Sequence, residues 1–313
     1  MSRHSHLLAL LALPLLLAAN TPQPLQLLDG ESTFGWTVSG TASLASGKLV
    51  LGPGKAVAQH DIRLPKGEIV LVYSLPRGTA TADQQPLKVG DQLTQSWAFA
   101  GGKLRLTTGE DSQLSIHSLT YTPIAGQSLF DGKSLAGWTV FPDRKSKFTV
   151  TPEGWLNVID GPGDLQTVGQ WDDFLFQTEC ISNGQWLNSG IFFRAIPGQY
   201  QQGYEAQIRN QWVGNDRSKP FDFGTGAIYR RQPARKVVST DKEWFTLTIV
   251  ADGNHIATWV NGIQVADFTD SRATAANARQ GSKTTAGILS IQGHDPTTDL
   301  SFRNLRVVPL NEK

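Results

Sequence analysis

The sequence predicts an all-β protein built from two sandwich-like units, a smaller one followed by a larger one. Short segments with alternating apolar and polar residues recur along the 313-residue chain, and Gly, Pro, Asn and Asp separate them. Apolar residues at helical spacing are scarce. The chain has 31 Gly, 16 Pro and 9 Trp but one Met, a composition that fits pleated sheets better than a helical bundle.

The first twenty residues are typical of a secretory signal peptide. Arg3 supplies a positive charge, residues 7–19 are almost entirely Leu and Ala, and a polar break follows at 20–24. The apolar run is short for a bilayer span, which favours a cleaved signal peptide. The alternative interpretation is an uncleaved N-terminal anchor. No cysteine follows the run, as a lipoprotein would require, and no later segment is apolar enough to cross a membrane. We therefore expect a periplasmic or secreted protein without membrane contact.

A repeated stretch divides the rest of the chain into two units. Residues 27–38 (LLDGESTFGWTV) and 129–140 (LFDGKSLAGWTV) are identical at eight of twelve positions, and residues 114–124 are similar to 300–310. Both units should therefore open and close with equivalent strands. We expect a small β domain at 25–125, a truncated repeat with a binding or spacer role, and a larger domain at 127–310.

Strands are expected wherever alternation is clear between turn residues. The ranges are 48–51, 67–73, 103–107, 114–121, 148–150, 155–159, 174–181, 190–194, 204–209, 245–251, 255–260, 263–268, 287–292 and 300–308. Gly and Asn at 252–254 and 261–262 predict two hairpin turns. Residues 272–282 are polar and rich in Ala, and we expect a surface loop or short helix there.

Composition and missing motifs exclude several classes of function. The chain carries 28 Lys and Arg against 27 Asp and Glu, so it lacks the basic excess that binds nucleic acid. Cys180 is the one cysteine, which excludes an intramolecular disulfide and a cysteine-based zinc cluster. We find no Gly-x-Ser-x-Gly elbow, Walker loop or His-Glu-x-x-His helix, and no crowded carboxylates of the kind an ordinary glycosidase uses.

Several short motifs occur in the second unit in a recognisable order. They are 128–138 (SLFDGKSLAGW), 171–174 (WDDF), 188–194 (NSGIFFR), 203–208 (GYEAQI), 226–229 (GAIY), 243–244 (EW), 261–262 (NG), 287–294 (GILSIQGH) and 302–305 (FRNL). Together they make residues 127–310 resemble the 3-keto-disaccharide hydrolase domain family. The resemblance implies a concanavalin A-like jelly-roll sandwich, an exported protein and a saccharide as substrate.

Alternation along the strands sorts the polar residues of these motifs onto one sheet face. On 204–208, Tyr204, Ala206 and Ile208 belong in the core, so Glu205 and Gln207 should face outward. The same reasoning on the neighbouring strands adds further polar side chains to that face: Asn188, Arg194, Gln292 and His294. The concave face of a jelly roll is a usual place for a sugar, whose hydroxyl groups need such partners.

We predict Glu205, His294 and Arg194 as catalytic residues, and a second group as substrate-binding residues: Asn188, Gln207, Tyr229, Gln292 and Trp212. Structural alternatives stay open for each. Glu205 and Arg194 could form an ion pair that only holds the sheet. His294 could be a turn residue before Asp295-Pro296, the glutamines a hydrogen-bond scaffold, and Trp212 part of the rim of the core.

The family resemblance further implies a sugar already oxidised at C3, whose C2 proton a base can remove before the C1 substituent leaves. His294 or Glu205 would be the base, and Arg194 would steady the enolate. No cofactor is certain, but a divalent metal ion is possible, with Glu205 as its candidate oxygen ligand. The alternatives are a non-catalytic carbohydrate-binding or adhesion module and a purely structural exported β protein. The oligomeric state is not predicted.

Overall fold

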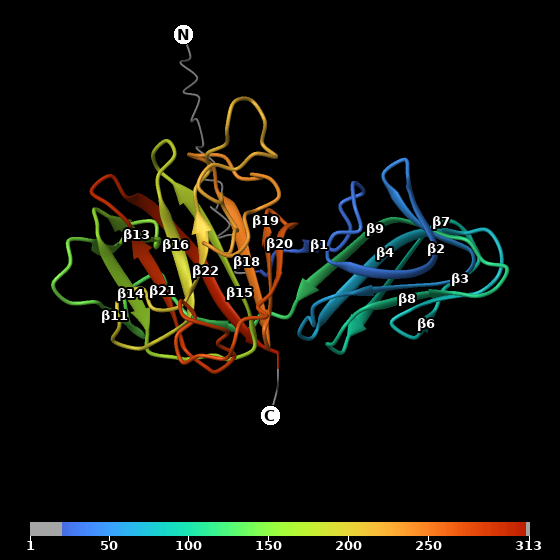
Figure 1. The fold of residues 1–313 in the computed structure, drawn as a ribbon, viewed down its shortest axis with the longest axis horizontal. Coiled ribbons are helices and arrows are strands. Elements are labelled where there is room, and N and C mark those ends of the chain that lie inside the picture. Colours follow the sequence, from blue (N-terminus) through green and yellow to red (C-terminus); the bar gives the residue numbers. More distant parts are fainter. Residues whose placement is uncertain (1–20, 311–313) are drawn as a thin grey trace, which may run out of the picture.

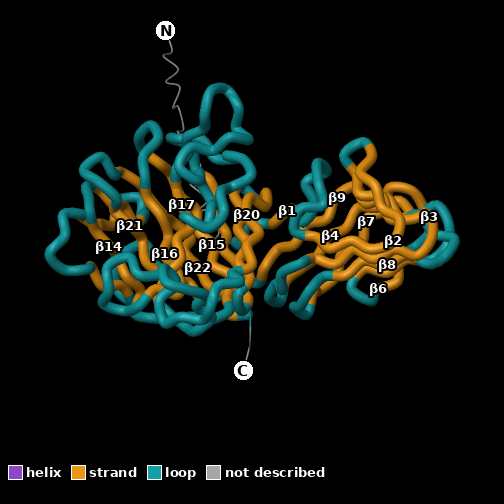
Figure 2. Tube along the Cα trace, in the orientation of Figure 1, coloured by secondary structure: helices purple, strands orange, loops and turns teal. Residues whose placement is uncertain are grey.

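The structure, a computed structural model, describes residues 21–310. These residues form strands and no helix, so the all-β prediction is confirmed. Figure 1 shows a larger and a smaller body of strands joined side by side, and Figure 2 shows loops gathered at the ends of the larger body. The predicted signal peptide, residues 1–20, lies outside the described residues. Among the described residues no helix is long and apolar enough to cross a membrane.

The smaller unit contains nine strands. They are β1 (Leu25–Gln26), β2 (Trp36–Ala45), β3 (Lys48–His60), β4 (Gly67–Leu75), β5 (Ala80–Ala82), β6 (Gln85–Pro86), β7 (Gly90–Phe99), β8 (Arg105–Thr108) and β9 (Leu114–Pro123). β2 and β3 form a long antiparallel hairpin. The first part of β3 pairs with β9 and its last part with β8, so this strand belongs to both halves of the unit. β9 continues to β4 and β7, and β8 continues to β5 and β6.

The larger unit contains the remaining strands. They are β10 (Gln127–Ser128), β11 (Trp138–Val140), β12 (Lys147–Val150), β13 (Leu156–Ile159), β14 (Gly163–Thr167), β15 (Phe174–Ser182), β16 (Ser189–Ala195), β17 (Tyr204–Ile208), β18 (Phe245–Asp252), β19 (His255–Val260), β20 (Ile263–Thr269), β21 (Ile288–Gly293) and β22 (Asp299–Pro309). The segment 272–282 has no helix and is a loop.

Two sheets face each other in the larger unit, as a concanavalin A-like jelly roll requires. The front sheet has the order β11-β14-β21-β16-β17. In the back sheet β20, β19, β18, β15, β22, β13 and β12 follow one another. Alternate residues of both sheets, such as Phe176 and Ile249 from the back and Ile191 and Ala206 from the front, fill the core between them. The front sheet therefore has one face on the core and one free to form a site.

The smaller unit covers the outer face of the back sheet. β1 pairs with β9 on one side and, in parallel, with β20 on the other, so it connects the sheets of the two units. The core of the smaller unit also includes residues of the larger one, among them Leu175, Val250 and Trp259. The two units are therefore packed together through apolar side chains, on the side of the back sheet opposite to the front sheet.

Candidate functional site

The outer face of the front sheet carries two rows of residues, most of which have polar side chains. In one row Gln166, Ser290, Phe192 and Glu205 are cross-strand neighbours from β14 through β21 and β16 to β17. In the second row Asp164 pairs with Gln292, and Gly190 pairs with Gln207. Neighbouring side chains on one face of a sheet contact each other, so these rows form a continuous polar floor.

Gly190 leaves space in the centre of this floor. A Cβ atom at this position would lie 2.6 Å from Oε1 and 2.9 Å from Cγ of Glu205. Because these distances are shorter than van der Waals contact, only glycine allows the Glu205 side chain its observed place. The NSG motif at 188–190 therefore shapes the hollow as well as contributing Asn188 to it.

A cavity of about 220 Å³ lies over this floor, and six of the eight predicted site residues line it. They are Asn188, Glu205, Gln207, Tyr229, Gln292 and His294. A second cavity of about 320 Å³ shares Glu205 and Tyr229 with the first and extends toward Gly203 and Ala278. Volumes of a few hundred cubic ångströms are the lower end of the range for small-ligand sites.

Glu205 is the most unusual group in this cavity. The residue as a whole is 6% exposed, and the carboxyl group of Glu205 accepts no hydrogen bond from the residues that the structure describes. Burial raises the pKa of Glu205 to about 8, with Asp222 and Asp164 adding to the rise and Arg279 and Arg230 opposing it. A buried, unpaired carboxyl group with a pKa near neutrality is typical of a catalytic acid or base.

Two glutamines and an asparagine surround the carboxyl group. Gln207 Nε2 donates to Oδ1 of Asn188 at 3.1 Å, which fixes both amides. The Oε1 atom of Gln292 is buried and has no hydrogen-bond partner among the described residues. An unpartnered buried acceptor is costly, so this amide is available for a donor that the protein does not supply, such as a hydroxyl group.

His294 lies at the edge of the cavity with 41% of its side chain exposed. Its Nδ1 is 2.9 Å from Oδ2 of Asp295, which holds the ring in place. With Nδ1 engaged, Nε2 remains for a ligand or substrate. The structure therefore brings His294 to the same cavity as Glu205, and the turn before Asp295-Pro296 serves to orient it.

Four lining residues were not predicted from the sequence: Tyr200, Gln201, Arg230 and Arg279. Arg279 comes from the loop after β20, and its guanidinium carbon is 5.5 Å from the ring centroid of Phe192. Arg230 follows Tyr229 and lies 5.3 Å from the centroid of that ring. Both arginines lie in segments without regular strands, so alternation could not have placed them.

Asp164 of β14 was also missed. It is buried next to Gln292, and burial raises the pKa of its carboxyl group although Ser290 and Gln166 donate to it. It lies in the polar floor and holds Gln166 and Ser290 in position. The short sequence 163–167 gave no clear alternation, so neither the strand nor its carboxylate was predicted.

Arg194 does not line the cavity, and the prediction that it shares a face with Glu205 is wrong. The pairing of β16 with β21 slips between Phe192 and Ala195, and Arg194 itself has φ +45°. The alternation therefore ends before Arg194, and its side chain points away from the polar floor.

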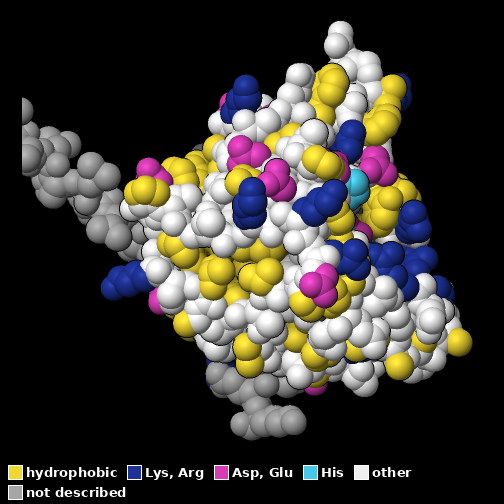
Figure 3. Space-filling view, turned by 90° about the vertical axis from the view of Figure 1, so that its left-hand side faces the viewer, with side chains coloured by type: hydrophobic (Ala, Val, Ile, Leu, Met, Phe, Trp, Pro, Cys, Tyr) yellow, Lys and Arg dark blue, Asp and Glu magenta, His cyan; other side chains and the backbone are white. Residues whose placement is uncertain are grey.

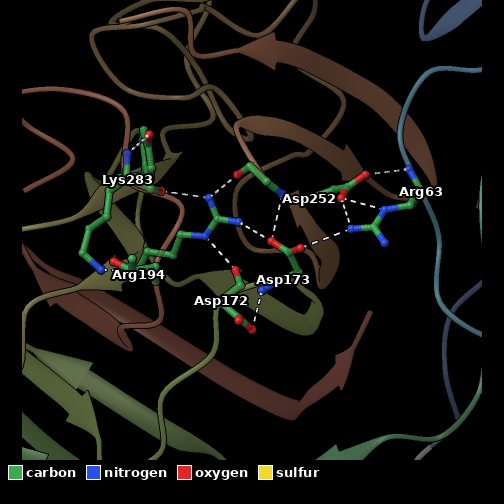
Figure 4. Close-up of polar contacts among 9 residues, drawn as sticks. Arg63, Asp172, Asp173, Arg194, Asp252 and Lys283 are labelled. Atoms are coloured by element: carbon green, nitrogen blue, oxygen red, sulfur yellow. Dashed lines mark hydrogen bonds and ion pairs between the residues drawn. The ribbon is translucent and has the colours of Figure 1, made fainter. Parts of the chain in front are cut away.

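The buried guanidinium of Arg194 instead donates to backbone oxygens (Figure 4). These are the oxygens of Asp172 at 2.7 Å, Gly253 at 2.5 Å and Lys283 at 2.9 Å. It also pairs with Oδ1 of Asp173 at 2.9 Å, and the other oxygen of Asp173 lies 3.2 Å from Arg63 of the smaller unit. Arg194 therefore joins loops at the junction of the two units.

Trp212 is also separate from the site. It lines another cavity together with Trp186, Asn210 and Asp241. Arg217 already stacks on Trp212, with its guanidinium carbon 4.2 Å from the ring centroid. The tryptophan predicted to stack on the substrate is therefore not part of the cavity that holds Glu205.

The donor set does not fit the divalent cation considered above. In residues 21–310 no three His, Cys, Asp or Glu side chains are grouped so that they could hold a metal ion. Glu205 shares its cavity with arginines and amides, and a hard cation needs several oxygen ligands with negative charge among them.

Comparison with known proteins identifies the larger unit. The family model of the 3-keto-alpha-glucoside-1,2-lyase-like domain matches residues 125–308. None of the curated protein sequences matches the chain.

Solved structures with similar folds include a protein from Parabacteroides distasonis described as a glycosyl hydrolase, at 22% identity. The match covers 58% of this chain and 93% of the Parabacteroides chain, with a TM-score of 0.47. The carbohydrate-binding module CBM66 from Bacillus subtilis is 17% identical. The match covers 55% of this chain and 94% of the module, with a TM-score of 0.41. The family match spans more than half of the sequence and includes every residue of the cavity. The chain belongs to the family of 3-keto-alpha-glucoside-1,2-lyase-like domains.

Proposed function

We propose that this protein cleaves the glycosidic bond of 3-keto-glycosides by elimination, with Glu205 as the base that removes the C2 proton. Membership of the family supports a role in acting on carbohydrates. The 3-keto-glycoside as substrate and the elimination as reaction are what we propose. Export through the N-terminal residues 1–20 is part of it, because it would place the enzyme where such glycosides are encountered.

The carboxyl group of Glu205 carries this proposal. It is buried, it has no hydrogen-bond partner in the described part of the chain, and its pKa is about 8. At pH 7 about a tenth of such a group is ionised, and the ionised form is a much stronger base than an ordinary glutamate. The proton at C2 is acidified by the adjacent C3 ketone, so a base of this strength is matched to it.

The elimination proceeds in two stages. Glu205 takes the C2 proton, and the electron pair of that C–H bond forms the enolate of the C3 ketone. The enolate then expels the C1 oxygen of the leaving group, which gives a C1=C2 double bond conjugated with the ketone. Addition of water at C1, with return of a proton to C2, completes a net hydrolysis; without it the reaction is that of a lyase.

Other lining residues supply the remaining roles. The enolate oxygen needs a positive or hydrogen-bonding group, and Arg230 and Arg279 are the cationic side chains next to Glu205. They take the role that sequence analysis gave to Arg194. His294, oriented by Asp295 and partly open to solvent, is suited to protonate the leaving oxygen.

The test compares Glu205→Gln with the wild type on a 3-keto-glucoside that has a chromogenic leaving group. We expect kcat/KM to fall at least about 100-fold, since general-base catalysis contributes about 10²–10⁴. Glu153→Gln, which removes an exposed carboxylate of the same unit, serves as the matched control and should keep full activity. The parent glucoside without the ketone should not be cleaved by any variant.

Hydrogen exchange at C2 in D₂O separates the proton transfers. Wild type and His294→Gln should both exchange the C2 proton of the keto-sugar, whereas Glu205→Gln should not. Wild-type kcat/KM should rise with pH and level off above about 8, where Glu205 is ionised. Unchanged turnover in Glu205→Gln would refute the site, and saccharide binding without any product would favour the non-catalytic binding module.

A further inference from the structure

We propose that the cavity next to Glu205 binds an anionic group of the saccharide, so that the preferred substrates are acidic glycosides carrying a uronate carboxylate or a sulfate ester. This inference rests on the proposed function, because it names the substrate class of the same site. It comes from three arginines that line this cavity together: Arg230, Arg231 and Arg279.

The guanidinium groups of these arginines have unused donors. The guanidinium group of Arg230 contacts the ring of Tyr229 and makes no hydrogen bond or ion pair with the residues that the structure describes. Arg279 uses Nε to donate to the backbone oxygen of Gln201 at 2.6 Å, and its terminal nitrogens have no hydrogen-bond partner in the described chain. Guanidinium groups with free terminal N–H groups match the geometry of carboxylate and sulfate oxygens.

Arg231 holds the other two arginines together. Its terminal nitrogens donate to the backbone oxygens of Arg230 at 3.2 Å and of Arg279 at 3.0 Å. Burial is the main cause that lowers the pKa of Arg231, and the nearby charges of Arg272 and Arg279 add to it, while Asp270 and Tyr204 oppose it. The chain therefore brings like charges together at this point, which is unfavourable unless an anion occupies the space between them.

The protein supplies no ionised carboxylate to balance them within the described lining. Glu205, which lies on the border of the two cavities, is mostly neutral at pH 7. Asp270 lies under this region but is already bonded to Arg272 and, at 2.7 Å, to the Tyr204 hydroxyl. The local positive charge is therefore left for a ligand.

This charge is local and does not reflect a basic protein. The whole chain carries a formal charge of +1. On the face shown in Figure 3, Lys and Arg side chains gather on one side beside a histidine. Concentration of positive charge at one cleft of a nearly neutral protein favours an anionic ligand at that cleft over general attraction to anionic surfaces.

The test measures binding separately from turnover. Calorimetry on Glu205→Gln compares three glycosides with the same aglycone: a glucoside, a glucuronide and a glucoside 6-sulfate. We expect at least one anionic glycoside to bind about 10-fold more tightly than the neutral one at low salt, and this preference to shrink in 0.5 M NaCl. The two anionic ligands distinguish a carboxylate site from a sulfate site.

Arg230→Gln, made in the Glu205→Gln background, should reduce that preference to less than about threefold, because it removes a positive charge that makes no hydrogen bond or ion pair within the described chain. Arg77→Gln, the same charge change at an exposed arginine of the smaller unit, is the matched control and should retain the preference. Equal affinity for the three glycosides, or a preference that Arg230→Gln leaves intact, would overturn the inference. An anionic preference without turnover of any keto-glycoside by wild type would refute the proposed function and leave the anion-binding cavity as a ligand site.

Discussion

The two units of this chain begin with the same structure built from the same residues. In the smaller unit Asp29 Oδ1 accepts the N–H groups of Glu31 and Ser32, and in the larger unit Asp131 Oδ1 accepts those of Lys133 and Ser134. The following tryptophans also repeat a contact. Nε1 of Trp36 donates to the oxygen of Leu27 at 2.6 Å, and Nε1 of Trp138 to that of Leu129 at 2.7 Å. The repeated residues therefore form a structural turn.

The units differ in what lies between the repeated ends. Between its repeated ends the larger unit has the strands β14, β16, β17 and β21 of the front sheet, whose polar floor and loops form the cavity around Glu205. No described residue of the smaller unit lines either of the two cavities that include Glu205. The repeat therefore specifies a frame, and the site belongs to the segments inserted into it.

A second difference lies at the junction, where the smaller unit covers the outer face of the larger unit's back sheet. Trp259 of β19 stacks on His60 of β3 at a centroid distance of 6.2 Å, and His60 contacts Trp36 edge-on at 5.2 Å. The turn of the smaller unit therefore also serves the junction, whereas the equivalent turn of the larger unit does not.

The largest effect is expected from removing Arg194, the junction residue contributed by the larger unit. Arg194→Ala leaves three backbone oxygens and Asp173 without their buried donor, which should lower the free energy of unfolding by about 4 kcal/mol. Arg63→Ala removes the residue that meets Asp173 from the smaller unit, and its side chain is 39% exposed. We expect a loss of about 1 kcal/mol there. Urea denaturation measures both, and equal losses would contradict the structural role given to Arg194.

The next effect concerns Glu205 and its dependence on pH. Its pKa is raised to about 8 in the folded protein, so between its ordinary value and pH 8 the unfolded chain loses a proton that the folded protein keeps. Folding is therefore weakened as pH rises through this window. Glu205→Gln removes this cost, and its stability relative to wild type should grow from little at pH 4 to on the order of 3 kcal/mol at pH 7.

The exposed Glu153→Gln variant is the control for this experiment and should show no such growth. A constant difference between Glu205→Gln and wild type across the pH range would mean that Glu205 is ionised in the folded protein at neutral pH.

Most of the frame could be predicted from the sequence, because strand alternation and turn residues are local signals. The same rule correctly separated Tyr204, Ala206 and Ile208, which lie in the core, from Glu205 and Gln207. It failed at Arg194, where a bulge ends the alternation. A bulge depends on how the neighbouring strand pairs, which a single segment does not reveal.

The arginines of the site could not be predicted for another reason. Arg230 and Arg279 lie in irregular loops that follow different strands, and they line one cavity only because those loops contact each other over the outer face of the front sheet. Residue type alone did not distinguish them from other surface arginines. Gly190 was visible in its motif, but its purpose depends on the close approach of Glu205 from the adjacent strand.

A smaller effect distinguishes the two repeated turns. Asp29 is bonded to Arg235 of the larger unit in addition to its own turn, and its side chain is 8% exposed. Asp29→Ala should therefore lower the free energy of unfolding by about 2–3 kcal/mol. Asp131→Ala removes a turn cap that is open to solvent and should cost clearly less. Arg235→Gln should reproduce most of the Asp29 effect and none of the Asp131 effect, and identical losses for the two aspartates would show that the repeats are energetically equivalent.

The smallest effect is expected at the junction in mild acid. His60 is fully buried between Trp36 and Trp259, and burial lowers the pKa of its imidazole although Ile62 and Asp267 favour the charged form. The unfolded chain takes up a proton on this histidine below about pH 6.5, whereas the folded protein does not, so stability is lost as pH falls through that value. Between pH 6.5 and 5.5 the loss should be about 1 kcal/mol.

His60→Phe, which keeps an aromatic ring between the two tryptophans, should remove this part of the acid sensitivity. His117→Gln changes a less buried histidine of the same unit and should retain it. Since His60 lies at the junction and not at the cavity, the acid loss should appear in the thermal unfolding of both units, and a profile for His60→Phe that still follows wild type would show that the junction does not sense this proton.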